Sequence, residues 1–180
     1  MSTSSLHGAL AAWMRELGAD CVSVETPCLD AASRTTFANP ARVLAILRPR
    51  CREDVQIAVR IASQFGVALY PFSSGRNWGY GSRAPVEDGV LLDLGAMNRI
   101  LDFDEALGYV TVEPGVTQRQ LSDFLRQRGS RLWMDATGAS VECSVVGNTL
   151  ERGFGHTPLG DHAANVCGLE VVLPTGECVE

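Results

Sequence analysis

The stretch Pro71-Phe-Ser-Ser-Gly-Arg-Asn-Trp-Gly-Tyr-Gly-Ser82 places three glycines among hydroxyl, amide and guanidinium donors, directly after a predicted strand. Glycine lets backbone N–H groups converge on phosphate oxygens because no Cβ blocks their approach, and Ser73, Ser74, Arg76 and Asn77 can add further donors. The spacing fits neither the dinucleotide fingerprint G-x-G-x-x-G nor a P-loop, since no Gly-Lys-Ser/Thr follows. The residues alone leave two interpretations open, an anion-binding loop and a glycine-rich surface turn.

A strand, a helix and a second strand are predicted ahead of this stretch. Val43–Leu47 is short and apolar throughout, which is typical of a buried strand. Apolar residues then recur at i, i+3, i+4 and i+7 from Val55 to Ala62, and they mark one face of a helix that Gly66 ends. Val67–Phe72 forms the second strand, which leads directly into the glycine-rich stretch.

Further strands and another helix are predicted after the glycine-rich stretch. Val90–Leu94 reads as a strand, and Arg99–Phe103 with Tyr109–Val112 as a hairpin. Thr117 and Gln120 form a capping box that opens a helix with its apolar residues on one side. Short strands that alternate with helices, without an internal repeat or a linker, predict a mixed fold of α-helices and β-strands.

The end of the sequence is predicted to form a hairpin. Asn165–Leu173 is a long apolar strand, and Pro174–Gly176 turns it into a second strand that begins at Glu177. The sequence ends at Glu180, which would leave the edge of this hairpin unpaired. We therefore expect further residues to follow Glu180.

A second glycine-rich segment is Ser144-Val-Val-Gly-Asn-Thr-Leu-Glu-Arg-Gly-Phe-Gly-His-Thr-Pro-Leu-Gly-Asp-His162. We expect a long loop here, and such loops usually carry function. It also gathers the polar residues Asn148, Glu151, Arg152, His156, Asp161 and His162. An ordinary turn does not need them together, so a ligand site is favoured over a simple surface loop.

The two histidines of this segment do not predict a metal site. His156 and His162 lie six residues apart with only Asp161 as a further nearby ligand, and structural metal sites need more. The serines show no G-x-S-x-G elbow, and they form no local pattern with the histidines that would indicate a hydrolase.

Composition narrows the partners and the compartment. Fifteen basic and twenty-one acidic residues give a net charge of −6 without a basic stripe, which argues against nucleic-acid binding. The apolar stretch Leu6–Met14 is too short to cross a bilayer and runs into Arg15, so we expect an amphipathic helix and no membrane span. The six cysteines are far apart and contain no C-x-x-C pair, which is typical of buried thiols in a reduced, cytoplasmic protein.

Four motifs together resemble one family of flavoproteins. They are Ser74-Gly-Arg-Asn-Trp-Gly-Tyr-Gly-Ser82, Val112-Glu-Pro-Gly-Val-Thr117, Val146-Gly-Asn-Thr-Leu-Glu-Arg-Gly-Phe-Gly155 and Thr157-Pro-Leu-Gly-Asp-His162. Their order and approximate spacing are similar to those in the vanillyl-alcohol oxidase and p-cresol methylhydroxylase family, from about Val43 to Glu180. The resemblance implies an α+β fold, a two-lobed FAD-binding domain of the PCMH type with mixed sheets flanked by helices.

The resemblance also implies where FAD binds. Residues 1–180 would form the domain, with a first lobe at about residues 30–100 and a second at about 101–180. FAD would lie extended, with its pyrophosphate against Ser73–Trp78, its ribityl chain and ring beside Gly147–Asn148 and Arg152–His156, and its adenine near Glu170. The implied cofactor-binding residues are Ser73, Ser74, Gly75, Arg76, Asn77, Trp78, Gly79, Gly138, Ser140, Val146, Gly147, Asn148, Arg152, Gly153, Gly155, His156, Asp161, His162, Glu170 and Val171.

Two residues match positions near the substrate in this family. Tyr80 matches a tyrosine that stabilises an ionised phenol, and His156 stands where many relatives carry a tyrosine. A histidine there can donate a hydrogen bond or take a proton near neutral pH. The resemblance implies catalytic roles for both, in hydride transfer from an alcohol or alkylphenol-like small molecule to FAD. The stretch Asp135–Ser144 offers no clear equivalent of the carboxylate that some relatives place beside the flavin.

Three interpretations of the whole chain remain open. It is the FAD-binding portion of an oxidase or dehydrogenase whose C-terminal substrate domain is missing, a truncated fragment that binds FAD without turnover, or a structural module in which the glycine segments are only turns. For the enzyme, a homodimer or an electron-acceptor protein are the candidate macromolecular partners.

Overall fold

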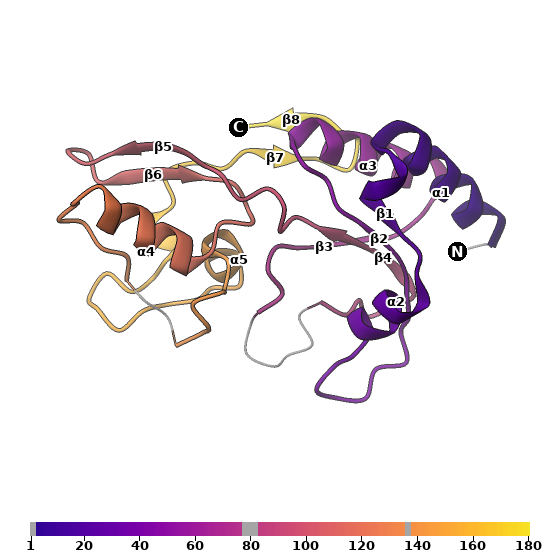
Figure 1. Cartoon of the computed structure of the whole chain (residues 1–180), viewed down its shortest axis with the longest axis horizontal. Helices are drawn as coiled ribbons and strands as arrows, with labels where there is room; N and C mark the ends of the chain where they lie inside the picture. The colour runs from indigo at the N-terminus through magenta and orange to yellow at the C-terminus, as the bar shows by residue number, and fades with distance from the viewer. Residues whose placement is uncertain (1–2, 77–82, 136–137) are drawn as a thin grey trace. The chain divides into compact units, whose positions relative to one another are not determined.

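The computed structural model describes residues 3–76, 83–135 and 138–180, and these residues fall into two compact units (Figure 1). Within them, the first unit comprises residues 3–72, 83–96 and 168–180, and the second comprises 73–76, 97–135 and 138–167. Residues 168–180 thus belong to the first unit, whereas the lobe division implied by the resemblance puts them in the second.

The first unit is built on a four-stranded sheet in the order β1–β2–β4–β3. Its strands are β1 (Val22–Ser23), β2 (Val43–Leu47), β3 (Leu69–Phe72) and β4 (Gly89–Asp93). β1 is antiparallel to β2, whereas β2, β4 and β3 are parallel to one another. The strand predicted over Val43–Leu47 is confirmed, and the two predicted over Val67–Phe72 and Val90–Leu94 differ from β3 and β4 only at their ends.

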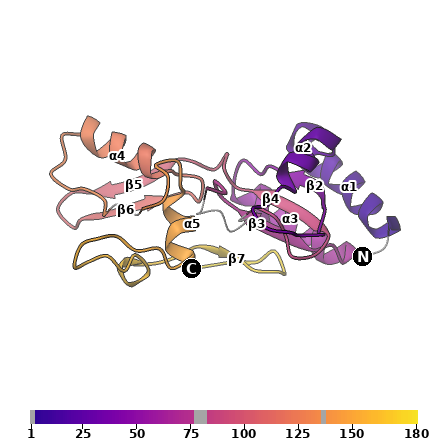
Figure 2. The ribbon, with the colours of Figure 1, turned by 90° about the horizontal axis from the view of Figure 1, so that it is seen from below.

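Helices cover both faces of this sheet because successive side chains of a strand point to opposite faces. The helices are α1 (Thr3–Leu17), α2 (Thr26–Ala32) and α3 (Arg52–Phe65), and α1 and α3 run side by side (Figures 1 and 2). Leu47 and Leu92 pack in the cluster formed with α1 and α3, whereas Ile46 and Leu91 pack in the cluster that holds Ala32 of α2.

A buried tryptophan links α1 to α3. Trp13 is fully buried, and its indole Nε1–H donates to the carbonyl of Ala58 at 3.1 Å. α3 ends at Gly66, which has a φ of 62° in the left-handed region, as the sequence predicts. The amphipathic helix predicted over Leu6–Met14 is confirmed within the longer α1.

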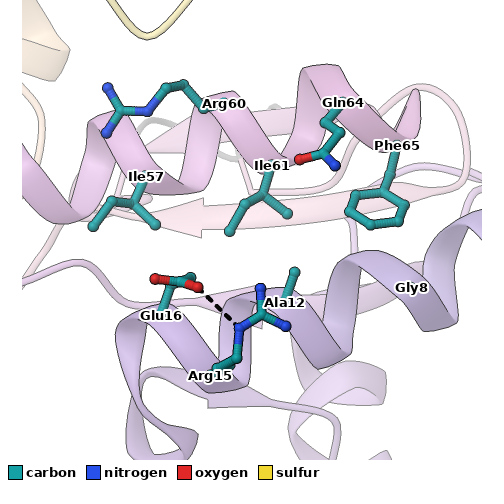
Figure 3. Close-up of a pocket in the computed structure, with 9 residues that line it drawn as sticks. All are labelled: Gly8, Ala12, Arg15, Glu16, Ile57, Arg60, Ile61, Gln64 and Phe65. Carbon is teal, nitrogen blue, oxygen red and sulfur yellow. Dashed lines mark hydrogen bonds and ion pairs between the residues drawn. The ribbon is translucent and has the colours of Figure 1, made fainter.

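A groove of about 410 Å³ remains between α1 and α3 (Figure 3). The helices approach closely, since a Cβ on Gly8 would lie 2.5 Å from the ring of Phe65. The groove is lined by Gly8, Ala12, Arg15, Glu16, Ile57, Arg60, Ile61, Gln64 and Phe65. None of the predicted cofactor-binding residues is among them.

The C-terminal hairpin packs on α3. It consists of β7 (Val171–Val172) and β8 (Cys178–Val179). Gln56 Nε2–H donates to Gly176 O at 2.8 Å, Ser63 Oγ–H donates to Pro174 O at 2.6 Å, and Glu170 forms an ion pair with Arg52.

The prediction of a long strand over Asn165–Leu173 is wrong. Only Val171–Val172 pair as a strand, β7, and Ala163–Asn165 forms the 3-10 helix η2. A run of apolar residues becomes a strand only where a neighbour supplies backbone partners. Among the described residues the partner of β7 is β8, which is two residues long.

The second unit packs a hairpin against a helix. Its elements are β5 (Ile100–Asp104), β6 (Tyr109–Val112), α4 (Gln118–Gln127) and α5 (Val145–Leu150). The predicted hairpin is confirmed, and so is the capping box of Thr117 and Gln120. The core is formed by Val116, Leu121 and Leu125, with Phe103 and Phe124 in an edge-to-face contact beside them.

A buried carboxylate joins the start of β5 to the end of β6. Glu113 is 6% exposed and accepts hydrogen bonds from the backbone N–H of Arg99 at 2.7 Å and from its guanidinium at 2.7 and 3.0 Å. Burial by itself would raise the pKa of Glu113, but the hydrogen bonds and charge of Arg99 outweigh burial, and the pKa lies below its usual value.

We predict that Glu113→Gln makes the second unit less sensitive to acid. Because the pKa of Glu113 is lower in the folded chain than in the unfolded chain, Glu113 stabilises the fold at every pH above its unfolded-state pKa. This stabilisation is lost as the pH falls through the folded-state pKa. The variant lowers the free energy of unfolding at pH 7 by about 1–3 kcal/mol, near the lower end because Arg99 is largely exposed. Urea denaturation at a series of pH values measures both effects.

The matched control is Glu142→Gln, which removes an exposed ion pair with Arg119 in the same unit. We expect it to change the free energy of unfolding by roughly 0.5 kcal/mol or less. If Glu113→Gln keeps the acid sensitivity of the unaltered chain, the electrostatic role of Glu113 is wrong.

Candidate functional site

Ser144 connects three segments of the second unit. Its side chain is 1% exposed, and its hydroxyl donates to Pro114 O at 2.6 Å while accepting from the backbone N–H of Gly147 at 2.9 Å. The Ser144 N–H donates to Ser74 Oγ at 3.0 Å. One buried residue thus joins the segment at residues 73–76, the motif Val112–Thr117 and the first turn of α5.

The prediction of a loop over Ser144–His162 is wrong for its first third, which forms the helix α5. Residues Val145–Leu150 are helical, because Ser144 caps the N-terminus and one glycine does not break so short a helix. The loop begins after Leu150, and Arg152 adopts a φ of 57°, which is uncommon for a residue with a side chain.

The segment at residues 73–76 lies directly against α5. A Cβ on Gly147 would lie 2.6 Å from Ser73 Oγ and 3.4 Å from Ser144 Oγ. Gly75 has a φ of 58°, which turns the chain after Ser74, and Arg76 is exposed. The structure therefore brings two predicted cofactor-binding segments, Ser73–Arg76 and Val146–Asn148, into contact.

Two further predicted residues, Gly153 and His162, meet Asn148 near the C-terminal end of α5. Asn148 is 7% exposed, and its Oδ1 lies 2.7 Å from Nδ1 of His162. A Cβ on Gly153 would lie 2.2–2.3 Å from the atoms of the Asn148 amide, so this position has no room for a side chain. His162 Nε2 is buried and has no hydrogen-bond partner among the described residues.

Asp135 is a neighbour of the site that sequence reasoning missed. Its carboxylate accepts a hydrogen bond from Thr157 Oγ1 at 2.7 Å, and a Cβ on Gly155 would lie 2.2 Å from its Cγ. Gly155 N–H donates to Gly160 O at 2.9 Å, which closes the loop around this contact. The signal that could have found Asp135 is Gly155, which leaves room for a side chain against the backbone, but nothing in the sequence indicates which side chain lies there.

The remaining predicted residues are placed differently. His156, Arg152 and Asp161 are exposed on the loop, Val146 is half-buried on α5, and Gly138 and Ser140 are exposed. Glu170 and Val171 belong to the first unit, where the carboxylate of Glu170 forms an ion pair with Arg52 at 2.9 Å. Asn77, Trp78, Gly79 and Tyr80 lie outside the described residues.

The thiol beside this site is unsuited to nucleophilic chemistry. Cys143 is buried, and burial raises the pKa of its thiol, which keeps the thiol protonated near neutral pH. No group of three or more His, Cys, Asp and Glu side chains within the described ranges could hold a metal ion. Among the helices described, none is long and apolar enough to cross a membrane.

A protein-family model described as an FAD binding domain matches residues 43–180. This chain belongs to that family. The match covers the four-stranded sheet from β2 onward, the hairpin β5–β6 and the whole α5 site, so the segments that Ser144 joins are parts of an FAD-binding domain.

Curated relatives agree with this family. The chain is 50% identical over 178 residues to the 1'-carboxy-chondrochloren decarboxylase of Chondromyces crocatus. The matched region covers 98% of this chain and 33% of the relative. It is 42% identical over 126 residues to the 4-cresol dehydrogenase [hydroxylating] flavoprotein subunit of Pseudomonas putida, covering 69% and 24%. The chain thus spans a third or less of the length of these relatives.

Solved structures give the same fold. A 4-ethylphenol oxidase from Gulosibacter chungangensis superimposes with a TM-score of 0.94 at 37% identity, covering 99% of this chain and 35% of the other. A p-cresol methylhydroxylase with substrate bound gives a TM-score of 0.94 at 34% identity, covering 99% and 36%. The α+β, PCMH-type FAD-binding fold expected from the sequence is therefore confirmed.

The residues of the second unit fit FAD. At Gly147, Gly153 and Gly155 the missing Cβ lets the side chains of Ser73, Asn148 and Asp135 lie directly against the backbone. This packing gathers hydroxyl, amide and carboxylate groups that can bind the polar groups of FAD. The buried and unpartnered Nε2 of His162 requires a hydrogen-bond partner that the described residues do not supply.

We predict that Gly147→Ala weakens FAD binding with little change in stability. The added methyl group would displace Ser73 Oγ, while the higher helix propensity of alanine offsets part of the cost, so the free energy of unfolding changes by about 1 kcal/mol or less. FAD affinity falls roughly tenfold, the effect of one lost hydrogen bond to a charged group. Titration of FAD against protein fluorescence measures the affinity.

Gly168→Ala is the matched control, because a Cβ there meets no atom within 4 Å. It should leave FAD affinity unchanged. Equal affinity of the Gly147→Ala variant and the unaltered chain would show that Ser73 and α5 do not contact FAD.

Proposed function

We propose that this chain is the FAD-binding portion of a flavin-dependent oxidoreductase that transfers a hydride from an alcohol or alkylphenol-like substrate to FAD. The observation that carries the proposal is the contact between Ser73–Arg76 and α5, made through Ser144 and Gly147, in a chain of the FAD binding domain family. When bound, FAD supplies the ring that accepts the hydride.

The residues of the chain would bind and orient that cofactor. Ser73, Ser74 and the backbone of residues 75–76 would face its pyrophosphate, because hydroxyl and N–H groups are the donors that phosphate oxygens need. The segment from Gly147 to Gly155 would lie beside the ribityl chain and the ring.

His156 and Tyr80 remain the proposed catalytic residues. His156 is exposed on the loop that follows α5, where its imidazole is accessible to a substrate and can donate or accept a hydrogen bond. Tyr80 would stabilise an ionised phenol. The structures of a 4-ethylphenol oxidase and a p-cresol methylhydroxylase, at 37% and 34% identity, support a phenolic substrate.

The whole enzyme would need more than these residues. The chain covers about a third of its relatives, so a substrate domain would complete the pocket and exclude water. Electrons would then pass to oxygen or to an acceptor protein, and the relative named as a flavoprotein subunit favours the acceptor protein. A homodimer and a cytoplasmic location stay predictions from the sequence.

Decarboxylation is a second candidate reaction. The relative that is 50% identical over nearly the whole chain is named a decarboxylase of a carboxylated compound. The exposed Arg152 next to Gly153 offers a guanidinium that could bind a substrate carboxylate.

We predict that the purified 180-residue chain retains FAD after gel filtration, at about one FAD per chain by its visible spectrum. Protein that elutes without flavin after incubation with excess FAD would contradict FAD binding by this chain.

We also predict which compounds reduce the bound flavin. Under anaerobic conditions, 4-ethylphenol should bleach the flavin absorbance if the chain carries the oxidoreductase chemistry. Bleaching only by a carboxylated alkylphenol would favour the decarboxylase, provided that the substrate loses one carbon dioxide and passes two electrons to FAD. Retained flavin that none of these compounds bleaches would favour the interpretation as a fragment without turnover.

A further inference from the structure

The pair Asn148 and His162 leaves one buried nitrogen without a partner. His162 Nδ1 lies 2.7 Å from Asn148 Oδ1, and His162 Nε2 is buried with no hydrogen-bond partner among the described residues. The two residues come from the end of α5 and from the loop that precedes η2, fourteen positions apart. Their contact is therefore made by the tertiary fold.

The hydrogen bond to Asn148 fixes which nitrogen of His162 carries the proton. With the amide oxygen of Asn148 facing the ring, Nδ1 is the donor of this hydrogen bond, because a carbonyl oxygen only accepts. In the neutral ring Nε2 then has a free lone pair and is an acceptor. Buried polar atoms are nearly always paired, so this lone pair indicates a donor that comes from outside the described residues.

The position of Asn148 makes this arrangement rigid. Asn148 is 7% exposed, its backbone N–H donates to Ser144 O at 3.0 Å, and its own carbonyl accepts from Gly153 N–H at 2.7 Å. Gly153 packs flat against the amide group, which has no space to rotate toward that side. The imidazole is thus held by a side chain that is itself fixed, as in a positioned binding group.

FAD offers few groups that can donate to this nitrogen. Its phosphate oxygens and ring carbonyls only accept. Its donors are the hydroxyls of the ribityl and ribose groups, the imide N3–H of the isoalloxazine ring, and the amino group of adenine, which the resemblance puts near Glu170. We infer that His162 Nε2, with its ring held as the Nδ1–H tautomer by Asn148, accepts a hydrogen bond from a hydroxyl or the imide N–H of bound FAD. This inference rests on the proposed FAD binding and adds the atom, the tautomer and the direction of the hydrogen bond.

The tautomer is tested directly on the unaltered chain. Long-range ¹⁵N–¹H spectra separate the rings of His7, His156 and His162, and the His162→Gln spectrum assigns the signal. We expect Nδ1 of His162 to be protonated and Nε2 to be unprotonated, with the Nε2 signal shifting upfield when FAD is added. A proton on Nε2, or an Nε2 signal that FAD leaves unchanged, would overturn the inference.

The contribution to binding is tested with His162→Phe, which keeps an aromatic ring and removes the acceptor. We expect FAD affinity to fall about tenfold, as for the loss of one buried hydrogen bond. The control His7→Phe changes an exposed histidine of α1 and should bind FAD as the unaltered chain does. Circular dichroism of each variant shows whether it is folded.

The outcomes separate this inference from the proposed function. If the unaltered chain binds no FAD, the proposed function fails. If the unaltered chain binds FAD and a folded His162→Phe variant binds it equally well, only the role of His162 fails. Titration with FAD methylated at N3 identifies the donor. If the unaltered chain binds methylated FAD more weakly than FAD, and His162→Phe causes no further loss with methylated FAD, the donor is the imide N–H. If the unaltered chain binds both compounds equally well, the donor is a hydroxyl.

Discussion

The second unit depends on the buried hydroxyl of Ser144. It donates to Pro114 and accepts from Gly147, while the backbone N–H of the same residue donates to Ser74. A buried hydroxyl without partners is costly, so all of these segments must be in place together. The segment after β3, the turn after β6 and the start of α5 therefore form one structure, and this structure carries the proposed FAD-binding residues Ser73–Arg76 and Val146–Asn148.

Glycine serves two purposes in this chain. Gly66 and Gly129 have positive φ values and end helices, which is a requirement of the backbone. Gly147, Gly153 and Gly155 do not have positive φ values. A Cβ at these positions would collide with Ser73, Asn148 and Asp135, respectively. These three glycines allow polar side chains to lie against the backbone, and this close packing suits a segment that must lie flat along an extended cofactor.

Features of the fold that depend on neighbouring residues could be predicted from the sequence. Features that depend on contacts between distant residues could not. The end of α3 at Gly66 and the capping box of Thr117 follow from neighbouring residues, so both were predicted correctly. The helix α5 was missed because its glycine suggested a loop, while its cap at Ser144 is held by Pro114, thirty residues away. In the site, Asn148 and His162 were predicted separately, but their contact and the unpaired Nε2 depend on how the loop closes, which no spacing rule supplies.

The central claim is that Ser73–Arg76 and α5, joined by Ser144, form one surface for FAD. A crystal structure of the 180-residue chain grown with FAD tests it most directly. We expect the diphosphate of FAD within hydrogen-bond distance of the hydroxyls and N–H groups of residues 73–76, with another part of the same molecule beside His162. FAD bound elsewhere, with both segments facing only solvent, would contradict the account.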